Sequence, residues 1–116
     1  MASKALVFCE IKRGKFKKGS LEALSEAKKM VQATGGDVTA VVVGGSEAKE
    51  LASSLGQYGA NRALVASEDW LADWNAEAVT RLVVAATKAE NPELLFISAT
   101  LDGKDLAPRV AAALDV

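Results

Sequence analysis

Four short runs of apolar residues recur along the chain and predict β-strands. They occupy residues 5–11, 38–43, 63–66 and 94–97. The last run is apolar at every position, which is the pattern of a strand that is covered on both faces of a parallel sheet. We therefore expect residues 94–97 to form a strand in the middle of the sheet.

Amphipathic segments that begin at capping residues separate these runs and predict helices. Ser20, Ser46 and Asn75 can each accept a hydrogen bond from the free amides of a helix start. Gly35-Gly36 and Gly56 are expected to end the first two helices. The residues that would face the sheet are Leu21, Leu24, Ala27 and Val31 in the first helix, Ala48, Leu51, Ala52 and Leu55 in the second, and Val79, Leu82, Val83 and Ala86 in the third.

A fourth helix follows the last strand, and Pro108 bears on where it starts. Proline lacks an amide proton and is tolerated among the first ~4 helical positions, where that proton would have no partner. Asp102 and Asp105 can each cap this helix, and Pro108 favours Asp105. The apolar face expected to pack on the sheet consists of Leu106, Val110, Ala113 and Leu114.

Strand and helix alternate about four times with short connections, and this order predicts the fold class. Right-handed crossovers turn such a repeat into an α/β three-layer sandwich with a mainly parallel sheet. We expect the strand order 3-2-1-4. With 116 residues, of which 50% are hydrophobic, the chain fits one domain spanning residues 1–116.

Composition and charge exclude several classes of partner and location. The net charge of −1 gives no general attraction to nucleic acid or to an anionic membrane. A basic loop at residues 12–18 is interpreted as solvated, with docking of a protein partner as the alternative. No apolar run approaches the ~20 residues of a membrane span, and no signal peptide is recognisable. Because Cys9 is the only cysteine, we expect a reducing compartment, either bacterial cytoplasm or mitochondrial matrix.

The sequence offers little for catalysis. It has no histidine, so Ser-His-Asp and Cys-His centres and the usual imidazole zinc sites are excluded. Neither the phosphate loop of nucleotide hydrolases nor a G-x-G-x-x-G motif is present. Glu10, Asp102 and Asp105 could converge as acids, bases or metal ligands, but we interpret them as caps and solvated acids. No catalytic, cofactor-binding or metal-binding residue is therefore predicted.

One cleft is nevertheless expected where the strand order reverses, at the carboxyl ends of the first and fourth strands. Its mouth would be formed by Cys9, Glu10, Ser98, Ala99 and Thr100. The amides of residues 103–106 could hold a phosphate, but the neighbouring carboxylates of Asp102 and Asp105 would repel it. We expect a structural cleft, and whether Glu10, Thr100 and Gly103 bind any nucleotide stays open. Arg109 is expected to pair with an acid or with a partner surface.

Trp70 and Trp74 lie one helical turn apart between the third strand and the third helix. Two indoles at such a junction could stack on a partner or a base. We expect them instead to close an edge of the core.

The segment after the last strand carries a resemblance to a known family. Ala99-Thr100, followed by Gly103-Lys104-Asp105-Leu106-Ala107-Pro108-Arg109-Val110-Ala111-Ala112, resembles the signature of the electron transfer flavoprotein alpha subunit. The similarity extends upstream through Glu10, Ser20-Leu21-Glu22 and Tyr58-Gly59-Ala60, and so covers nearly the whole chain. Cys9 and Ile11-Lys12-Arg13 depart from the acidic or histidine-containing loop that is usual in the family, which leaves the identity of the partners open.

The resemblance implies the amino-terminal domain of that subunit, with a fold like that of the nucleotide alpha hydrolases. Such a protein pairs with a beta subunit and passes electrons from flavin dehydrogenases to an acceptor. In the family, FAD is held mainly by a carboxy-terminal domain of the alpha subunit. We therefore expect FAD in a full-length parent protein, and no cofactor or catalytic centre in this chain.

Two further expectations accompany the resemblance. The sequence stops at Asp115-Val116 directly after the last helix, so we expect a domain truncated at its carboxyl end. A domain cut in this way would expose an interaction surface and could self-associate, first through the sheet edge beyond the last strand.

The alternative reading is a free-standing adenine-nucleotide-binding domain of the universal stress type. A lone Gly103 stands where that family usually has a glycine-rich loop.

Overall fold

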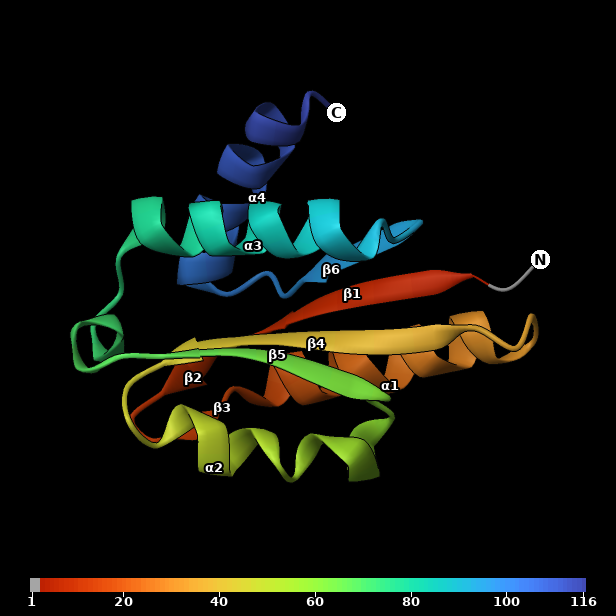
Figure 1. Cartoon of the computed structure of the whole chain (residues 1–116), viewed down its shortest axis with the longest axis horizontal. Helices are drawn as coiled ribbons and strands as arrows, with labels where there is room; N and C mark the ends of the chain where they lie inside the picture. The colour runs from red at the N-terminus through yellow and green to blue at the C-terminus, as the bar shows by residue number, and fades with distance from the viewer. Residues whose placement is uncertain (1–2) are drawn as a thin grey trace.

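A computed structural model describes residues 3–116, and a parallel four-stranded sheet lies at its centre (Figure 1). The strands are β1 (Lys4–Cys9), β4 (Asp37–Gly44), β5 (Arg62–Ser67) and β6 (Leu94–Ile97). They are ordered β5-β4-β1-β6, and every neighbouring pair is parallel. This arrangement confirms the predicted order 3-2-1-4.

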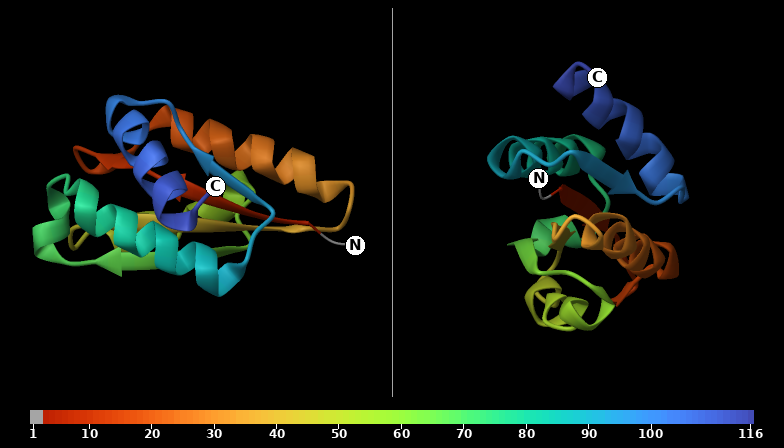
Figure 2. Two further views of the ribbon diagram at one scale, coloured as in Figure 1. Left: turned by 90° about the horizontal axis from the view of Figure 1, so that it is seen from above. Right: turned by 90° about the vertical axis from the view of Figure 1, so that its right-hand side faces the viewer.

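Helices cover both faces of the sheet and complete the three layers. They are α1 (Lys18–Gln32), α2 (Ala48–Ala52), α3 (Ala76–Glu90) and α4 (Leu101–Leu114), with short 3-10 turns η1 (Leu55–Tyr58) and η2 (Asp69–Ala72). In Figure 1, α1 and α2 lie below the sheet, and α3 and α4 lie above it. Figure 2 shows α4 standing at an angle to the other helices, beside β6. No helix within residues 3–116 has the length and apolar character needed to cross a membrane.

The two central strands carry most of the core. In β1 and β4 every residue after the first is buried. Successive side chains of β1 point to opposite faces. Val7 joins an apolar cluster with Leu24 of α1, and Leu6 joins a second cluster with Val83 of α3. Continuous apolar runs are therefore what these two strands require, because both faces are covered.

The last strand does not lie where its pattern placed it. β6 hydrogen-bonds to β1 alone within the described residues, so it is an edge strand, and the prediction of a central position is wrong. Leu94 and Phe96 pack toward the α1 cluster, while Leu95 and Ile97 pack toward the α3 cluster. An unbroken apolar run indicates that both faces of a strand are covered. It does not indicate whether the strand has a neighbouring strand on each side.

The basic loop at residues 12–18 begins as a hairpin that the sequence did not predict. β2 (Ile11–Lys12) and β3 (Lys15–Phe16) pair antiparallel. Arg13 and Gly14 join them with φ angles of 55° and 75°. Two successive positive φ angles are the signature of the tight turn that best fits a hairpin. The amide of Lys17 then donates to the carbonyl of Glu10 at 2.8 Å and ties the hairpin base to the end of β1.

Of the predicted N-caps, only Asn75 is confirmed. Its Oδ1 accepts from the amide of Ala78 at 3.0 Å at the start of α3. Ser20 lies inside α1, where its hydroxyl accepts from the amide of Glu10, and Ser46 does not cap α2. Gly56 does not end the second helical segment either, because η1 continues through it.

The start of α4 also differs from the prediction. Thr100 is the cap, and its Oγ1 accepts from the amide of Gly103 at 3.0 Å, so the assignment of Asp105 or Asp102 as the cap is wrong. Pro108 sits inside the helix and not in its first turn. Proline lacks the amide proton that would donate to the carbonyl of Lys104, so α4 has one backbone hydrogen bond fewer at this point.

The two tryptophans have different environments. Trp74 packs edge-on against Phe8, with ring centroids 6.5 Å apart, and closes an edge of the core as expected. Trp70 is 60% exposed, so the expectation that both indoles serve the core is wrong for this residue. Trp70 lies within η2, where Leu71 is the buried residue, whereas Trp74 lies beyond that turn and packs against Phe8.

Candidate functional site

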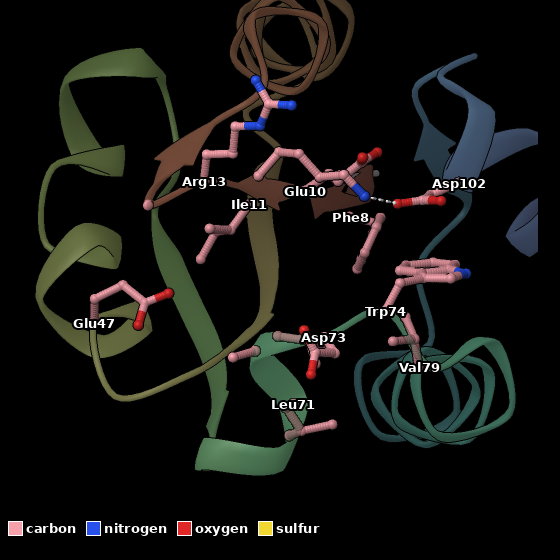
Figure 3. A pocket seen from close by; sticks show the side chains of 14 residues that line it. Phe8, Glu10, Ile11, Arg13, Glu47, Leu71, Asp73, Trp74, Val79 and Asp102 are labelled. Carbon is pink, nitrogen blue, oxygen red and sulfur yellow. Dashed lines mark hydrogen bonds and ion pairs between the residues drawn. The ribbon is translucent and has the colours of Figure 1, made fainter.

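A cavity of about 390 Å³ opens at the carboxyl end of the sheet, and we call it the cleft (Figure 3). The ends of β1 and β4, the β2–β3 hairpin, the segment around η2 and the start of α4 surround it. Its apolar wall consists of Phe8, Ile11, Val43, Leu71, Trp74 and Val79. Figure 3 shows Phe8 and Trp74 close together on one side, with Glu47 on the other.

Glu10 and Thr100, both predicted at the mouth, are brought into direct contact. Thr100 Oγ1 donates to Glu10 Oε1 at 2.5 Å. Glu10 is only 4% exposed, and its backbone amide donates to Ser20 Oγ at 2.9 Å. A buried carboxylate needs a donor such as Thr100 Oγ1, because burial without one would cost several kcal/mol. The pair therefore joins the end of β1 to the start of α4.

The start of α4 is closely packed at Gly103, and the amide of this residue is engaged. A Cβ built on this glycine would lie 1.9 Å from the carbonyl oxygen of Ser98, so the helix start is packed directly against the end of the β6 segment. The Gly103 amide is already used by Thr100. Of the amides that the sequence offered to an anion, that of Gly103 is therefore already engaged.

An ion pair that the sequence analysis missed closes one side of the cleft. Lys12 Nζ lies 2.6 Å from Asp102 Oδ2, and Figure 3 marks this contact with a dashed line at Asp102. The hydrogen bond to Asp102 is the main cause of a raised pKa for Lys12, which stays charged at neutral pH. Lys12 follows β1 and Asp102 follows β6, and these two strands are parallel neighbours. The predicted strand order therefore already placed both residues at the same edge of the sheet.

The remaining predicted residues do not gather at the mouth. Cys9 is fully buried in the α1 cluster, and desolvation raises the pKa of its thiol to about 12. Asp105 lies outside the cleft and pairs with Arg109 at 3.1 Å, which confirms the expectation that Arg109 pairs with an acid. Ser98 packs near Gly19 of α1 and does not line the cleft.

The charges of the cleft do not fit a phosphate-bearing cofactor such as FAD. Its acids are Glu10, Glu47, Asp73 and Asp102, and its bases are Lys12 and Arg13. Lys12 is already paired with Asp102. Among residues 3–116 the cleft acids that form no ion pair are Glu10, Glu47 and Asp73, and they outnumber the single base without an ion pair, Arg13. A pyrophosphate would add negative charge to this surface and be repelled. Within residues 3–116 no group of three His, Cys, Asp or Glu side chains is arranged to hold a metal ion.

Comparison with solved structures shows the fold. The chain resembles the crystal structure of a universal stress protein in complex with cAMP, with a TM-score of 0.55. The match covers 96% of this chain and 89% of that one at 13% sequence identity. A likeness at this identity establishes the α/β architecture alone.

Comparison of sequences shows the family. The electron transfer flavoprotein subunit alpha of Clostridium acetobutylicum is 36% identical over 108 residues, which is 93% of this chain and 32% of that protein. The acryloyl-CoA reductase electron transfer subunit beta of Anaerotignum propionicum is 34% identical over 108 residues, covering 93% of this chain and 29% of that protein. The chain thus spans about a third of the length of the curated relatives it matches. The model of the electron transfer flavoprotein domain matches residues 5–116, so the chain belongs to that family, as the segment around Gly103 indicated.

Proposed function

We infer that this chain acts as the scaffold and subunit-interaction domain of an electron transfer flavoprotein alpha subunit, corresponding to its amino-terminal part. The family match over residues 5–116 carries the inference, together with relatives that bear the alpha subunit name. The parent protein would pair with a beta subunit and pass electrons from flavin dehydrogenases to an acceptor. We place it in the bacterial cytoplasm, and the free thiol of Cys9 suits a reducing compartment.

In this role the domain positions other parts and has no redox centre or catalytic centre of its own. Support comes from two contacts at the cleft, in which Thr100 bonds Glu10 and Lys12 bonds Asp102. FAD would belong to the rest of the parent alpha subunit. The chemistry that FAD supplies is the acceptance and release of electrons, and this chain contributes stable surfaces that hold the subunits in place.

A second candidate function is binding of an adenine nucleotide, as in a free-standing domain of the universal stress type. The observation that favours it is the shared fold and an open cleft with an aromatic wall at the carboxyl end of the sheet. The acidic lining argues against it, because a phosphate would meet more carboxylates than free cations.

Mixing this chain with the beta subunit of an electron transfer flavoprotein from the same organism tests the proposed role. We expect a one-to-one complex that forms without added flavin, since the interaction surface belongs to the folded scaffold. Sedimentation velocity of the two proteins, separately and together, measures it. If the mixture sediments as the sum of the separate proteins at micromolar concentrations, the chain is not a subunit-interaction domain.

A further inference from the structure

β5 forms the outer edge of the sheet opposite β6 (Figure 1). It hydrogen-bonds to β4 on one side, and no strand within residues 3–116 pairs with its other side. A hollow of about 880 Å³ follows this edge. Lys49 of α2 lines it from one helical layer, and Ala78 and Leu82 of α3 line it from the other. The hollow therefore lies between the two layers, at the open side of the strand.

The edge lacks the devices that keep exposed strands from pairing. Proteins protect such edges with proline, with a central lysine or by covering them. Between Arg62 and Ser67, β5 contains only Ala63, Leu64, Val65 and Ala66. Val65 is 37% exposed and the nearby Trp70 is 60% exposed. Apolar side chains and unpaired backbone groups thus meet water along the same line.

We propose that β5 pairs antiparallel with β5 of a second copy of this chain. Leu64 and Ala66 pack toward the α3 layer, so alternation places Ala63 and Val65 on the α2 face. A two-fold axis perpendicular to the sheet keeps like faces together, and it must then lie midway between the two copies of one residue, which face each other across the strands. The two sheets would join into one continuous sheet of eight strands.

Charge complementarity selects the register. With the axis at Val65, Arg62 lies opposite Glu68 of the second copy, and the contact occurs twice. β5 ends at Ser67, but Glu68 keeps extended backbone angles of −139° and 144° and its amide donates to the carbonyl of Gly44, so the extended path reaches one residue further. The Arg62 side chain is 53% exposed even though it also contacts Glu90. An axis at Leu64 would place Arg62 opposite Ala66 instead.

This pairing is independent of the proposed function, because Arg62, Val65 and Glu68 do not line the cleft. It also differs from the expectation that self-association uses the edge beyond the last strand. β5 offers six residues for pairing, whereas β6 offers four. The longer edge provides more unpaired backbone groups.

A Val65→Cys variant tests the register directly. In the proposed pairing the two Cα atoms at position 65 are about 5 Å apart, within reach of a disulfide. Ala63→Cys is the matched control, because the two copies of position 63 are about 13 Å apart along the strands. Native Cys9 does not interfere, since it is buried and its pKa is about 12.

We expect Val65→Cys to form a covalent dimer at least roughly tenfold faster than Ala63→Cys under mild oxidation near pH ~8. Electrophoresis without reductant measures both rates. Equal rates, or no dimer from either variant, would overturn the proposal.

A second pair of variants covers the case in which cysteine alters the fold. Val65→Lys places two like charges at the axis and should weaken the dimer roughly tenfold or more in sedimentation equilibrium. Met30→Lys, at an exposed position of α1, should leave the association unchanged. A monomeric native chain, or equal weakening by both variants, would also contradict the pairing.

Discussion

Replacing Gly103 with Ala is expected to destabilise the folded chain by at least about 3 kcal/mol. The new Cβ would lie 1.9 Å from the carbonyl oxygen of Ser98 and 3.1 Å from Thr100 Oγ1. The first contact is with backbone, so it cannot be relieved by turning a side chain. The turn between β6 and α4 would have to open. Urea denaturation followed by circular dichroism measures the free energy of unfolding.

Gly56→Ala is the matched control for this substitution. A Cβ at Gly56 meets no atom within 4 Å, and its backbone does not adopt a positive φ. Reduced freedom of the unfolded chain should make this variant neutral or more stable by up to about 1 kcal/mol. Equal losses from both alanines would show that close packing at the start of α4 is not the cause.

Thr100→Val is expected to lower the free energy of unfolding by about 3 kcal/mol. Valine has a similar shape but removes the hydroxyl that bonds both Glu10 Oε1 and the amide of Gly103. Glu10 would stay buried with a weaker set of partners, and α4 would lose its cap. Thermal and urea unfolding of the variant, compared with the native chain, give the difference.

Thr87→Val serves as the comparison for Thr100→Val. The Thr87 hydroxyl donates to the carbonyl of Val83 within α3, and that contact bonds neither a buried carboxylate nor a helix start. We expect its loss to cost less than about 1 kcal/mol. A Thr100→Val variant that is no less stable than Thr87→Val would mean that the contact between Glu10 and Thr100 does not hold the cleft together.

The strand order and layers could be predicted because β1 and β4 are buried on both faces along nearly their whole length. Their sequences leave no polar positions from Val38 to Val43 except Thr39, and short connections then limit the topology. β6 shows the limit of this reasoning. Its run is equally apolar, yet within residues 3–116 it pairs with β1 alone, and coverage of both faces does not distinguish an edge strand from a central one.

The cleft was harder to predict because several neighbouring residues with similar chemistry could fill the same role. Thr100, Asp102 and Asp105 can all cap a helix, and contact with Glu10 decides in favour of Thr100. Pro108 misled the prediction, since a helix supported by packing tolerates the loss of one hydrogen bond. Trp74 lines the cleft just after the short η2 segment. The sequence of η2 shows no hydrophobic periodicity from which its path could be predicted.

Calorimetric titration of the native chain with FAD, and separately with AMP, tests most directly whether the cleft is structural. Because the Lys12–Asp102 pair closes one side and the carboxylates of Glu47 and Asp73 also line the cleft, we predict no binding heat from either ligand and a colourless purified protein. Stoichiometric binding of FAD at micromolar affinity would show that the flavin site lies in this chain. The same result with AMP would favour the nucleotide-binding alternative, and either outcome would contradict a scaffold without a cofactor of its own.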